Sequence, residues 1–333
     1  MASIFEQPWW IGAATDGAVR QIAFADGASC RAHLTVVPHR AWGLRRLAMP
    51  RLARVWSPQI TFGSVRPKNP LPAQVRALQG LVAQLPAHDD LAYTLPPESD
   101  LVLAHGLAGF AVTPTYTFRS VPCRDGMADD GMASDGMAGM DQKIRYNIRS
   151  GLKRVAAVEH GDIERYIGLS RAFIRSRAFR NSYDYDALRR IFRAAHERGQ
   201  GTVLSAHDRQ GRDVASAVLL LDERSVYYWL NCRDPEAGDY VANSVLIWEA
   251  MRYAAARNLQ FDMDGYHTPE AGVFLSRFGL TPVPRYAVSR ASPRYAMLSA
   301  QYDLAKSLLS PEMRGRLLGA RGLLAKVRAA RIR

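Results

Sequence analysis

Hydrophobic and polar positions along the second half of the chain change period several times, and each change marks an expected element. Apolar residues recur at helical spacing over 162–179 and again over 183–199, which predicts two helices, and three strand-like runs within 201–233 are joined by the short polar turns of an antiparallel meander. A helix over 241–259 and a short strand at 260–265 follow, and after a further short helix comes a strand at 283–290. This order predicts an α/β lobe built on a mixed sheet.

The first half shows the same two periods in a different arrangement. Two alternating runs over 18–38 flank the Gly-containing sequence "DGAS", which predicts a β-hairpin. Residues 71–86 carry apolar side chains at helical spacing between prolines, and 91–97 and 109–122 are further strand candidates. A first α/β unit is therefore expected to end near Pro122.

The sequence "DGMADDGMASDGMAGM", residues 125–140, separates these two parts. Its period of five rotates a helix by about 140° per copy, so the repeated methionines share no helical face, and its glycines oppose a helix. The period is too short for a solenoid, and the aspartates lack the spacing of a calcium loop. We expect a linker over 123–140, which is either a spacer or a lid over a cleft.

The length of 333 residues is typical of two domains of about 100–200 residues each. We expect an N-terminal lobe at 1–122, the linker at 123–140, a C-terminal lobe at 141–293 and a helical tail at 294–333. Three widely separated cysteines argue against a disulfide framework or a zinc cluster and favour a reducing cytoplasm. Neither a signal peptide nor a transmembrane helix is expected.

The net charge of +13 is concentrated at the C-terminal end of the chain. Residues 294–333 hold nine Arg or Lys and two acidic residues, a net charge of +7. Leucines alternate there with basic residues, which is typical of an amphipathic helix on an anionic membrane surface. A helix docked on the body with a solvated basic edge explains the same pattern, and the glycines of this tail weaken the membrane interpretation.

Several segments together resemble one enzyme family. "KIRYNIRSGLKR" resembles the arginine-rich helix that opens the second lobe of FemAB-like acyltransferases and their BioF2-like acetyltransferase relatives, within the GNAT superfamily. "NSVLIWEAMRYAAARNLQFDMDG" with "FLSRFG" resembles their helix, acidic strand and following helix, and "SIFEQPWW" with "MPRLARVWSPQI" resembles their opening. The resemblance covers roughly residues 3–290 and implies two GNAT-like lobes, the second better formed.

The resemblance implies a cytoplasmic N-acyltransferase that uses acetyl-CoA or another acyl-CoA and no metal. The acceptor it implies is an amine of a sugar, of a cell-envelope precursor or of an amino-acid derivative. Two departures leave the donor open: Ser276 stands where many relatives have Lys, and the Gly-rich loop that cradles the coenzyme A pyrophosphate is missing. One alternative is an aminoacyl-tRNA donor with a peptidoglycan precursor as acceptor. Another is a catalytically inactive scaffold on a membrane surface or on nucleic acid.

A helix over 141–155 would place a cationic edge beside an apolar one, because both residue types recur every four positions. The apolar stripe consists of Ile144, Ile148 and Leu152, and the cationic stripe of Arg145, Arg149 and Lys153. Aligned cations beside a packed wall can hold a phosphate or carboxylate of the substrate, and Arg forks suit bidentate contact. A solvated basic face is the alternative.

The helix expected to begin near Ala242 to Ser244 offers an anion its free backbone N–H groups and the positive end of its dipole. By the resemblance, the pyrophosphate of the donor binds at Ala242, Asn243 and Ser244. Alternatively, Asn243 or Ser244 only caps the helix.

The sequence "FDMDGYHTPE" holds the candidate acids and bases. Asp262 and Asp264 are two positions apart, so they point to the same side of a strand. Burying two carboxylates is costly unless they are paired or face a cleft, where one of them, or nearby His267, can take a proton from an amine. An aspartate paired with Arg285 or with the cationic stripe, next to a turn at Gly265, is the alternative.

Aromatic residues gather in the strand-like run "VYYWLNC". Alternation places Tyr227 and Trp229 on one face of this strand and Tyr228 on the other. One face is expected to line a substrate groove and the other to pack on helices, although core packing alone explains each residue. The chain has no GxSxG elbow, GxGxxG loop, Walker loop or HExxH pair, which argues against the chemistries that these motifs serve.

Overall fold

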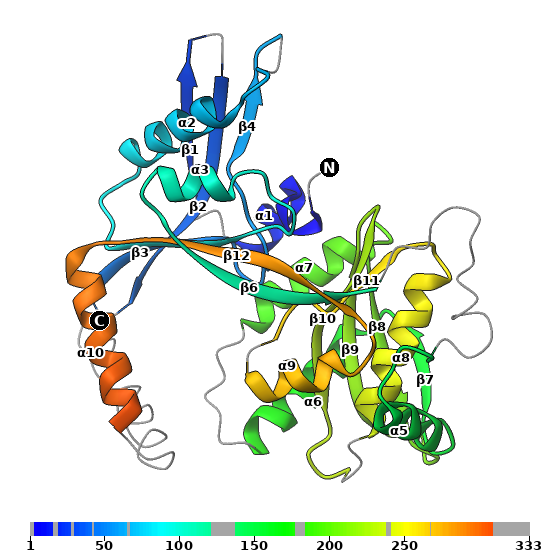
Figure 1. The fold of residues 1–333 in the computed structure, drawn as a ribbon. Helices are drawn as coiled ribbons and strands as arrows, with labels where there is room; N and C mark the ends of the chain where they lie inside the picture. Colours follow the sequence, from blue (N-terminus) through cyan, green and yellow to red (C-terminus); the bar gives the residue numbers. More distant parts are fainter. Residues whose placement is uncertain are drawn as a thin grey trace.

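The structure is a computed structural model in which twelve strands of the described chain form one mixed sheet (Figure 1). It describes residues 3–15, 19–27, 30–41, 43–64, 67–120, 137–176, 184–237, 241–266 and 268–308. The strand order is β1-β2-β3-β5-β12-β6-β11-β10-β9-β8-β7, and β4 pairs with β2. The predicted α/β class with a mixed sheet is confirmed.

The elements have the following bounds. The strands are β1 (Arg20–Asp26), β2 (Cys30–Ala41), β3 (Leu44–Ala48), β4 (Gln59–Phe62), β5 (Asp90–Leu95), β6 (Ala111–Arg119), β7 (Ala156–His160), β8 (Gly201–His207), β9 (Asp213–Leu221), β10 (Ser225–Arg233), β11 (Gln260–Asp262) and β12 (Thr281–Ala291). The helices are η1 (Ile4–Glu6), α1 (Pro8–Ala14), α2 (Leu71–Ala83), α3 (Val102–Leu107), α5 (Gln142–Leu152), α6 (Ile163–Ser176), α7 (Tyr185–His196), α8 (Val241–Ala255), α9 (Pro269–Ser276) and α10 (Pro293–Leu308).

The longer elements follow the sequence pattern. The hairpin predicted over 18–38 is confirmed, because β1 and β2 pair antiparallel with Asp26 opposite Cys30. The predicted meander is also confirmed, since β9 pairs antiparallel with both β8 and β10. The pattern did not predict β3, β4, β7, α1 and α3, none of which is longer than 7 residues. Such short elements span too few residues for a period to stand out.

The two halves of the chain contribute interleaved strands to the centre of the sheet. β6, from the first half, pairs with β11, and β12, the last strand, lies between β5 and β6. The antiparallel β6–β12 pairing is long, from Arg119 opposite Thr281 to Ala111 opposite Ser289. The sheet therefore continues through both halves without a break, and the domain limits given above stay a prediction.

Helices cover both faces of the sheet in the second half (Figure 1). One face packs with η1, α1, α6 and α7 around a core that includes Phe5, Trp10 and Trp229. The other face packs with α5 and α8 around a core that includes Ile148 and Tyr228. Although η1 and α1 precede β1 in the sequence, their side chains are buried with those of the second half, and α1 contacts α7.

The parallel strands β10 and β11 pair over only three residues, and Tyr227 and Asp262 are the last pair. Immediately after β11, Asp264 and Gly265 have φ values of 58° and 89°. This left-handed conformation turns the chain out of the strand direction. The two strands therefore separate after Tyr227 and Asp262, and we call this point the β10–β11 fork.

A bulge lies in β10 just beyond the β10–β11 fork. The register of β10 against β9 shifts between Tyr228 and Leu230, so that Trp229 has no partner on β9. A bulge re-aims the backbone and side chains of one strand relative to its neighbour. Here it changes the direction of the backbone of β10 on the edge that β11 has left.

The cationic helix predicted over 141–155 is present as α5, with Ile144 and Ile148 buried in the core. The predicted apolar stripe is wrong at its third position, because Leu152 is the last residue of the helix and is 45% exposed. A Cβ added at Gly151 would lie 2.5 Å from Val245 Cγ2. The last turn of α5 therefore packs directly on the first turns of α8.

Parts of the linker and of the tail lie outside the described residues. These are residues 123–136 of the linker, which include most of the repeat, and residues 309–333 of the tail. Met137 and Met140, at the end of the repeat, are buried in the core that α5 and α8 share. Among the described helices, none combines the length and the apolar character needed to cross a membrane.

Candidate active site

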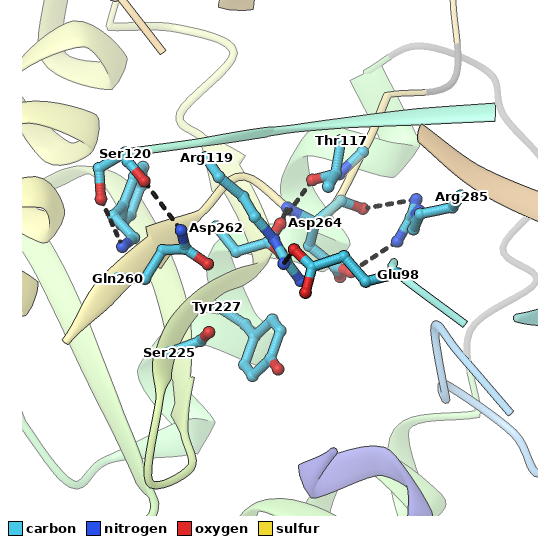
Figure 2. A network of polar contacts seen from close by, with 12 residues as sticks. Glu98, Thr117, Arg119, Ser120, Ser225, Tyr227, Gln260, Asp262, Asp264 and Arg285 are labelled. Carbon is cyan, nitrogen blue, oxygen red and sulfur yellow. Dashed lines mark hydrogen bonds and ion pairs between the residues drawn. The ribbon is translucent and has the colours of Figure 1, made fainter. Parts of the chain in front are cut away.

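A polar cavity of about 730 Å³ lies where strands of the two halves meet. It is lined by the N-terminal turn around Glu6, the β5–α3 connection around Glu98, the β9–β10 turn around Asp222, and the β10–β11 fork at Tyr227 and Asp262. Figure 2 shows the polar network at the fork, in which side chains from β6, from the end of β11 and from β12 point toward one another.

Asp262, the last residue of β11, is buried and fully engaged. Its Oδ1 accepts hydrogen bonds from Thr117 Oγ1 at 2.5 Å and from the Asp264 N–H at 2.8 Å. Its Oδ2 accepts a hydrogen bond from Arg119 Nε at 2.7 Å. These three bonds compensate for the burial of the carboxylate. Because Thr117 and Arg119 lie on β6, Asp262 ties the two halves of the chain together.

Asp264 is buried between two guanidinium groups. Arg54 Nε lies 2.7 Å from its Oδ2, and Arg285 Nη1 lies 3.4 Å from its Oδ1. Burial raises the pKa of Asp264 to about 7, although both arginines act to lower it, and neighbouring Asp262 adds to the rise. Within the described chain, the ion pair with Arg54 is the one polar contact found for Asp264 Oδ2. Asp264 therefore exchanges its proton near neutral pH, and it faces the cavity.

Gly265 allows Arg285 to reach Asp264. A Cβ at Gly265 would lie 2.2 Å from Arg285 Nη2, and the φ of 89° is itself a conformation that L side chains rarely adopt. Arg285 Nη2 also donates to the Asp264 carbonyl at 3.4 Å. The structure thus contains both the Arg285 pairing and the turn at Gly265 that the sequence offered as an alternative reading of this segment.

Acidic side chains outnumber basic ones around the cavity. The carboxylates among its lining residues are Glu6, Glu98, Asp222, Glu223, Asp262 and Asp264, and the guanidiniums are Arg119, Arg224 and Arg285. A concave surface with an excess of one charge raises the local concentration of the opposite charge. The cavity therefore favours a ligand that carries a cationic group.

Two of these carboxylates differ in their freedom to meet a ligand. Glu6 is held by a hydrogen bond of 2.6 Å from Ser57 Oγ, and burial raises the pKa of its carboxyl. Glu98 is 81% exposed and lies 3.9 Å from Arg119 Nη1. Its φ of 64° is uncommon for a residue with a side chain and costs conformational energy. Glu98 is therefore a strained, accessible carboxylate among the residues that line the cavity.

The predicted aromatic positions have different surroundings. Tyr227 lines the cavity and donates its hydroxyl hydrogen bond to Asp222 Oδ2 at 2.8 Å. Trp229 is not among the lining residues; it is buried with its ring 5.5 Å from that of Trp10. Tyr228 faces the opposite core, as alternation predicted.

The predicted donor-binding positions lie in the first turn of α8. Ala242 and Ser244 are buried, and Asn243 Oδ1 accepts a hydrogen bond from Tyr228 at 3.2 Å. Of the cationic stripe, Arg145 and Arg149 lie on α5 and Lys153 is its C-cap, and the last turn of α5 packs on the first turns of α8 at Gly151. Of that stripe, Arg145 is half-buried, and Arg149 and Lys153 are exposed. None of these six residues lines the described cavity.

The predicted residues thus form two groups. Asp262, Asp264 and Tyr227 meet at the β10–β11 fork, and the α5 stripe meets the start of α8. His267, the other predicted base, lies outside the described residues. In the described part of the chain, no group of three or more His, Cys, Asp or Glu residues can hold a metal ion.

Sequence reasoning missed three residues of the network. Thr117 and Arg119 lie on β6, and Arg54 lies between β3 and β4, so all three come from the first half of the chain. Arg54 belongs to the segment "MPRLARVWSPQI", which carried part of the family resemblance. That segment was the available signal, but nothing in it indicates a contact with Asp264, which is 210 positions further along the chain.

One comparison with known protein families concerns the segment that holds the β10–β11 fork. Residues 140–269 match the family model of the acetyltransferase (GNAT) domain. This range runs from the segment before α5 to the start of α9 and so includes both strands of the β10–β11 fork. A search of curated proteins found no match.

Solved structures share the fold at low sequence identity. FemX is similar over 86% of this chain and 92% of its own, with 12% identity and a TM-score of 0.60. The C-terminal domain of a putative lysylphosphatidylglycerol synthetase from Agrobacterium fabrum is similar over 89% of this chain and 96% of its own, with 12% identity and a TM-score of 0.55. L-PGS from Bacillus licheniformis is similar over 87% and 89%, with 9% identity and a TM-score of 0.53.

Proposed function

We propose that this chain, whose residues 140–269 belong to the GNAT acetyltransferase family, is an N-acyltransferase that moves an acyl group from a coenzyme A thioester to an amine. The observation that carries the proposal is the position of Asp264. It faces a polar cavity at the fork of two parallel strands, and its pKa is raised by burial to about 7. A base with a pKa near the working pH is suited to accept a proton from an attacking amine.

The cavity is the proposed acceptor site. An aliphatic amine enters as an ammonium ion, and the excess of carboxylates around the cavity favours that charge. Glu98 is accessible to the ammonium group, whereas Asp222 is occupied by the hydroxyl of Tyr227 and the N–H of Ile4. The acceptor class is therefore an amine on a small polar molecule, such as an amino sugar, an amino-acid derivative or a cell-envelope precursor.

The proposed donor site is the contact between α5 and α8. The phosphates of coenzyme A would bind at the first turn of α8, where Ala242, Asn243 and Ser244 lie, because backbone N–H groups and the helix dipole attract anions there. The cationic stripe of α5 packs beside that turn, so Arg149 and Lys153 supply the charge that a Gly-rich loop does not provide. The thioester would then reach toward the β10–β11 fork.

In the proposed reaction, the amine nitrogen attacks the thioester carbonyl carbon, a C–N bond forms and the C–S bond breaks. A backbone N–H at the bulge of β10 donates to the carbonyl oxygen as negative charge develops on it. Before the attack, the ammonium group gives one proton to Asp264, directly or through water, which frees the lone pair of the nitrogen. After the C–N bond has formed, the nitrogen loses a second proton, and the coenzyme A sulfur leaves as a thiol that takes up this proton. Asp262 is the less suitable base, because its oxygens already accept three hydrogen bonds.

A thermal-shift experiment with the full chain tests the donor. Acetyl-CoA and longer acyl-CoAs should raise the melting temperature, because a ligand of the native state stabilises it. Lys153→Glu should weaken this binding by about tenfold or more, since a charged hydrogen bond contributes roughly 1.5–3 kcal/mol, whereas Arg20→Glu on the exposed edge of β1 is the matched charge control. If no CoA ester shifts the melting temperature, the proposed function is wrong.

An aminoacyl-tRNA donor is the second candidate. It is favoured by the missing Gly-rich loop and by the fold shared with FemX and with the putative lysylphosphatidylglycerol synthetase domain. With this donor, binding should weaken steeply as salt increases, because contacts with RNA phosphates release counterions. A melting-temperature increase with aminoacyl-tRNA and none with any CoA ester would replace the first candidate by this one.

We also propose that the protein acts in the cytoplasm at an anionic membrane surface through its tail. α10 exposes Met297, Leu298 and Leu304, and the tail carries a net charge of +7. The full chain should sediment with vesicles of anionic lipid and not with zwitterionic vesicles, and truncation after residue 293 should abolish this. If truncation also removes all acyl-CoA binding from a folded body, an inactive scaffold explains the chain better.

A further inference from the structure

The segment between β3 and β4 has an unusual backbone and buried side chains. Ala53 N–H donates to the Pro50 carbonyl at 3.2 Å, which closes a tight turn. The residue before Ala53, Leu52, has a φ of 61°. This conformation usually requires glycine, so a leucine there is held at a conformational cost. Ala53 and Val55 are buried in the same core as Trp229, which keeps the segment in place.

This segment makes two hydrogen bonds with Trp229, the bulged residue of β10. Trp229 Nε1–H donates to the Leu52 carbonyl at 3.0 Å, and Arg54 Nη2–H donates to the Trp229 carbonyl at 2.8 Å. β11 has already ended at this level. Arg54 therefore supplies the hydrogen-bond donor that the next residue of a longer β11 would have offered to the Trp229 carbonyl.

The same guanidinium reaches the chain that leaves β11. Arg54 Nε lies 2.7 Å from Asp264 Oδ2, and the Arg54 side chain is only 22% exposed. Arg54 thus touches β10 with one nitrogen and the end of β11 with another, across the β10–β11 fork. The guanidinium is planar and rigid, so these two contacts fix the relative positions of Trp229 and Asp264.

We propose that Arg54 is a positioning residue that sets the separation of β10 and β11 at the fork where the acyl group is transferred. This inference rests on the proposed function, and it adds that the first half of the chain supplies the residue that holds the fork in shape. Arg54 itself need not touch donor or acceptor. It acts by fixing the backbone of β10 at its bulge and the carboxyl group of Asp264.

Precise placement is the reason that this role affects the rate. A displacement of about 1 Å from productive geometry can cost about 10²-fold in rate. A lysine at position 54 keeps the positive charge but lacks the rigid planar fork of a guanidinium, so it cannot hold Trp229 and Asp264 at a fixed separation. A methionine keeps much of the length and removes the charge, so Asp264 loses a cation that lowers its pKa.

The test compares Arg54→Lys and Arg54→Met with Arg46→Met. Arg46 forms a similar arginine–aspartate contact with Asp90, and neither residue lines the described cavity. With acetyl-CoA and an amine acceptor, kcat of Arg54→Lys should fall by about 10²-fold with a small change in KM. Arg54→Met should also move the acid limb of the pH–rate profile to higher pH, and Arg46→Met should do neither.

Hydrogen–deuterium exchange tests the bridge without substrate. Backbone amides of residues 228–232 and 261–266 should exchange faster in Arg54→Lys than in the wild-type protein, and those in Arg46→Met should not. Unchanged exchange in Arg54→Lys, or a kcat equal to that of the wild type, overturns the inference. If the wild-type protein has no acyltransferase activity, the proposed function fails, and the exchange result still decides whether Arg54 holds the fork.

Discussion

The sheet contains arginine–aspartate contacts in two regions. In the first region, each charged group is matched by one of opposite sign. In the first half, Arg46 of β3 donates from Nε at 2.9 Å and from Nη2 at 2.7 Å to one oxygen of Asp90 on β5. The two residues are register neighbours on parallel strands. One cation meets one anion in regular backbone conformation, as expected of a contact that serves stability.

The cluster at the β10–β11 fork is built differently. Three guanidiniums meet two carboxylates, and within the described residues Arg285 Nε makes no hydrogen bond, while Arg54 Nε and Asp264 Oδ2 contact each other only as an ion pair. Asp264 also has a left-handed backbone. Unmatched charge and backbone strain are typical of sites that meet a ligand or a proton. The Arg46–Asp90 contact thus only holds two strands together, whereas the fork also retains groups that can react with a ligand or a proton.

The largest effect on stability is expected at Asp262. This residue belongs to the fork, but its carboxylate is matched by an arginine, as that of Asp90 is. Asp262→Ala leaves buried Arg119 without its partner, so the free energy of unfolding should fall by about 3–5 kcal/mol. Urea denaturation measures this. Asp264→Asn, measured at pH 6, should cost far less, because the wild-type carboxyl is largely protonated there and asparagine is also neutral. Equal losses in the two variants would remove the distinction between the two aspartates.

The next effect concerns activity. Asp264→Asn should lower kcat/KM by about 10²–10⁴-fold, the usual contribution of a general base, while the protein stays folded. In the wild type, kcat/KM should rise with pH until Asp264 is ionised near pH 7, and the variant should lack this acid limb. Asp90→Asn is the control with an intact fork. A retained acid limb in Asp264→Asn would assign the base to another group.

A smaller effect is expected in the pH dependence of stability. The pKa of Asp264 in the folded protein, about 7, lies above its ordinary value of 3.8, so folding favours the protonated form. Its contribution to stability is complete below about pH 4 and is lost as the pH rises through about 7. The wild type should therefore lose stability relative to Asp264→Asn between pH 5 and pH 8 in urea denaturation. Parallel curves for the two proteins would show that the pKa is not raised.

The smallest effect is expected at Glu98. A non-glycine residue in a left-handed conformation is destabilised by about 1–2 kcal/mol, and glycine removes this strain. Glycine also loses more chain entropy on folding, which lowers the gain in stability by about 0.5–1 kcal/mol. Glu98→Gly should thus stabilise the protein by about 0.5–1 kcal/mol and raise KM for the amine acceptor. Glu98→Gln removes the charge and keeps the strain, so it should raise KM alone. Unchanged KM in both variants would remove Glu98 from the acceptor site.

Much of the fold could be predicted from the sequence, because long elements carry clear periods. Helix α7, whose buried residues recur every three or four positions, and strand β2, whose first residues alternate between buried and exposed, are examples. The pairing of β6 with β11 and the position of β12 between β5 and β6 could not be predicted. Alternation shows that a segment is a strand, but it does not show which strand it pairs with. The packing of Trp10 on the second half was hidden for the same reason: amphipathic pattern gives a buried face but not the surface that covers it.

The candidate site could be predicted in part. Asp262 and Asp264 were visible through their spacing and their apolar strand, and Arg285 was already a possible partner. Arg54 and Arg119 were not, because they approach the fork from the β3–β4 connection and from β6, more than 100 positions earlier in the chain. From sequence alone, a charged residue in a loop or on a strand is expected to be solvated. Its tertiary contact becomes visible only when the pairing order of the strands is known.

The raised pKa of Asp264 is tested most directly by a carbon-13 NMR titration of the aspartate carboxyl groups in the full chain. Asp264→Asn serves to assign the resonance. One aspartate resonance should titrate with a midpoint near pH 7 and should be missing from the spectrum of Asp264→Asn. If the resonance that disappears in Asp264→Asn instead titrates near the ordinary value of 3.8, Asp264 is an ionised partner of arginine at neutral pH and cannot be the proposed base.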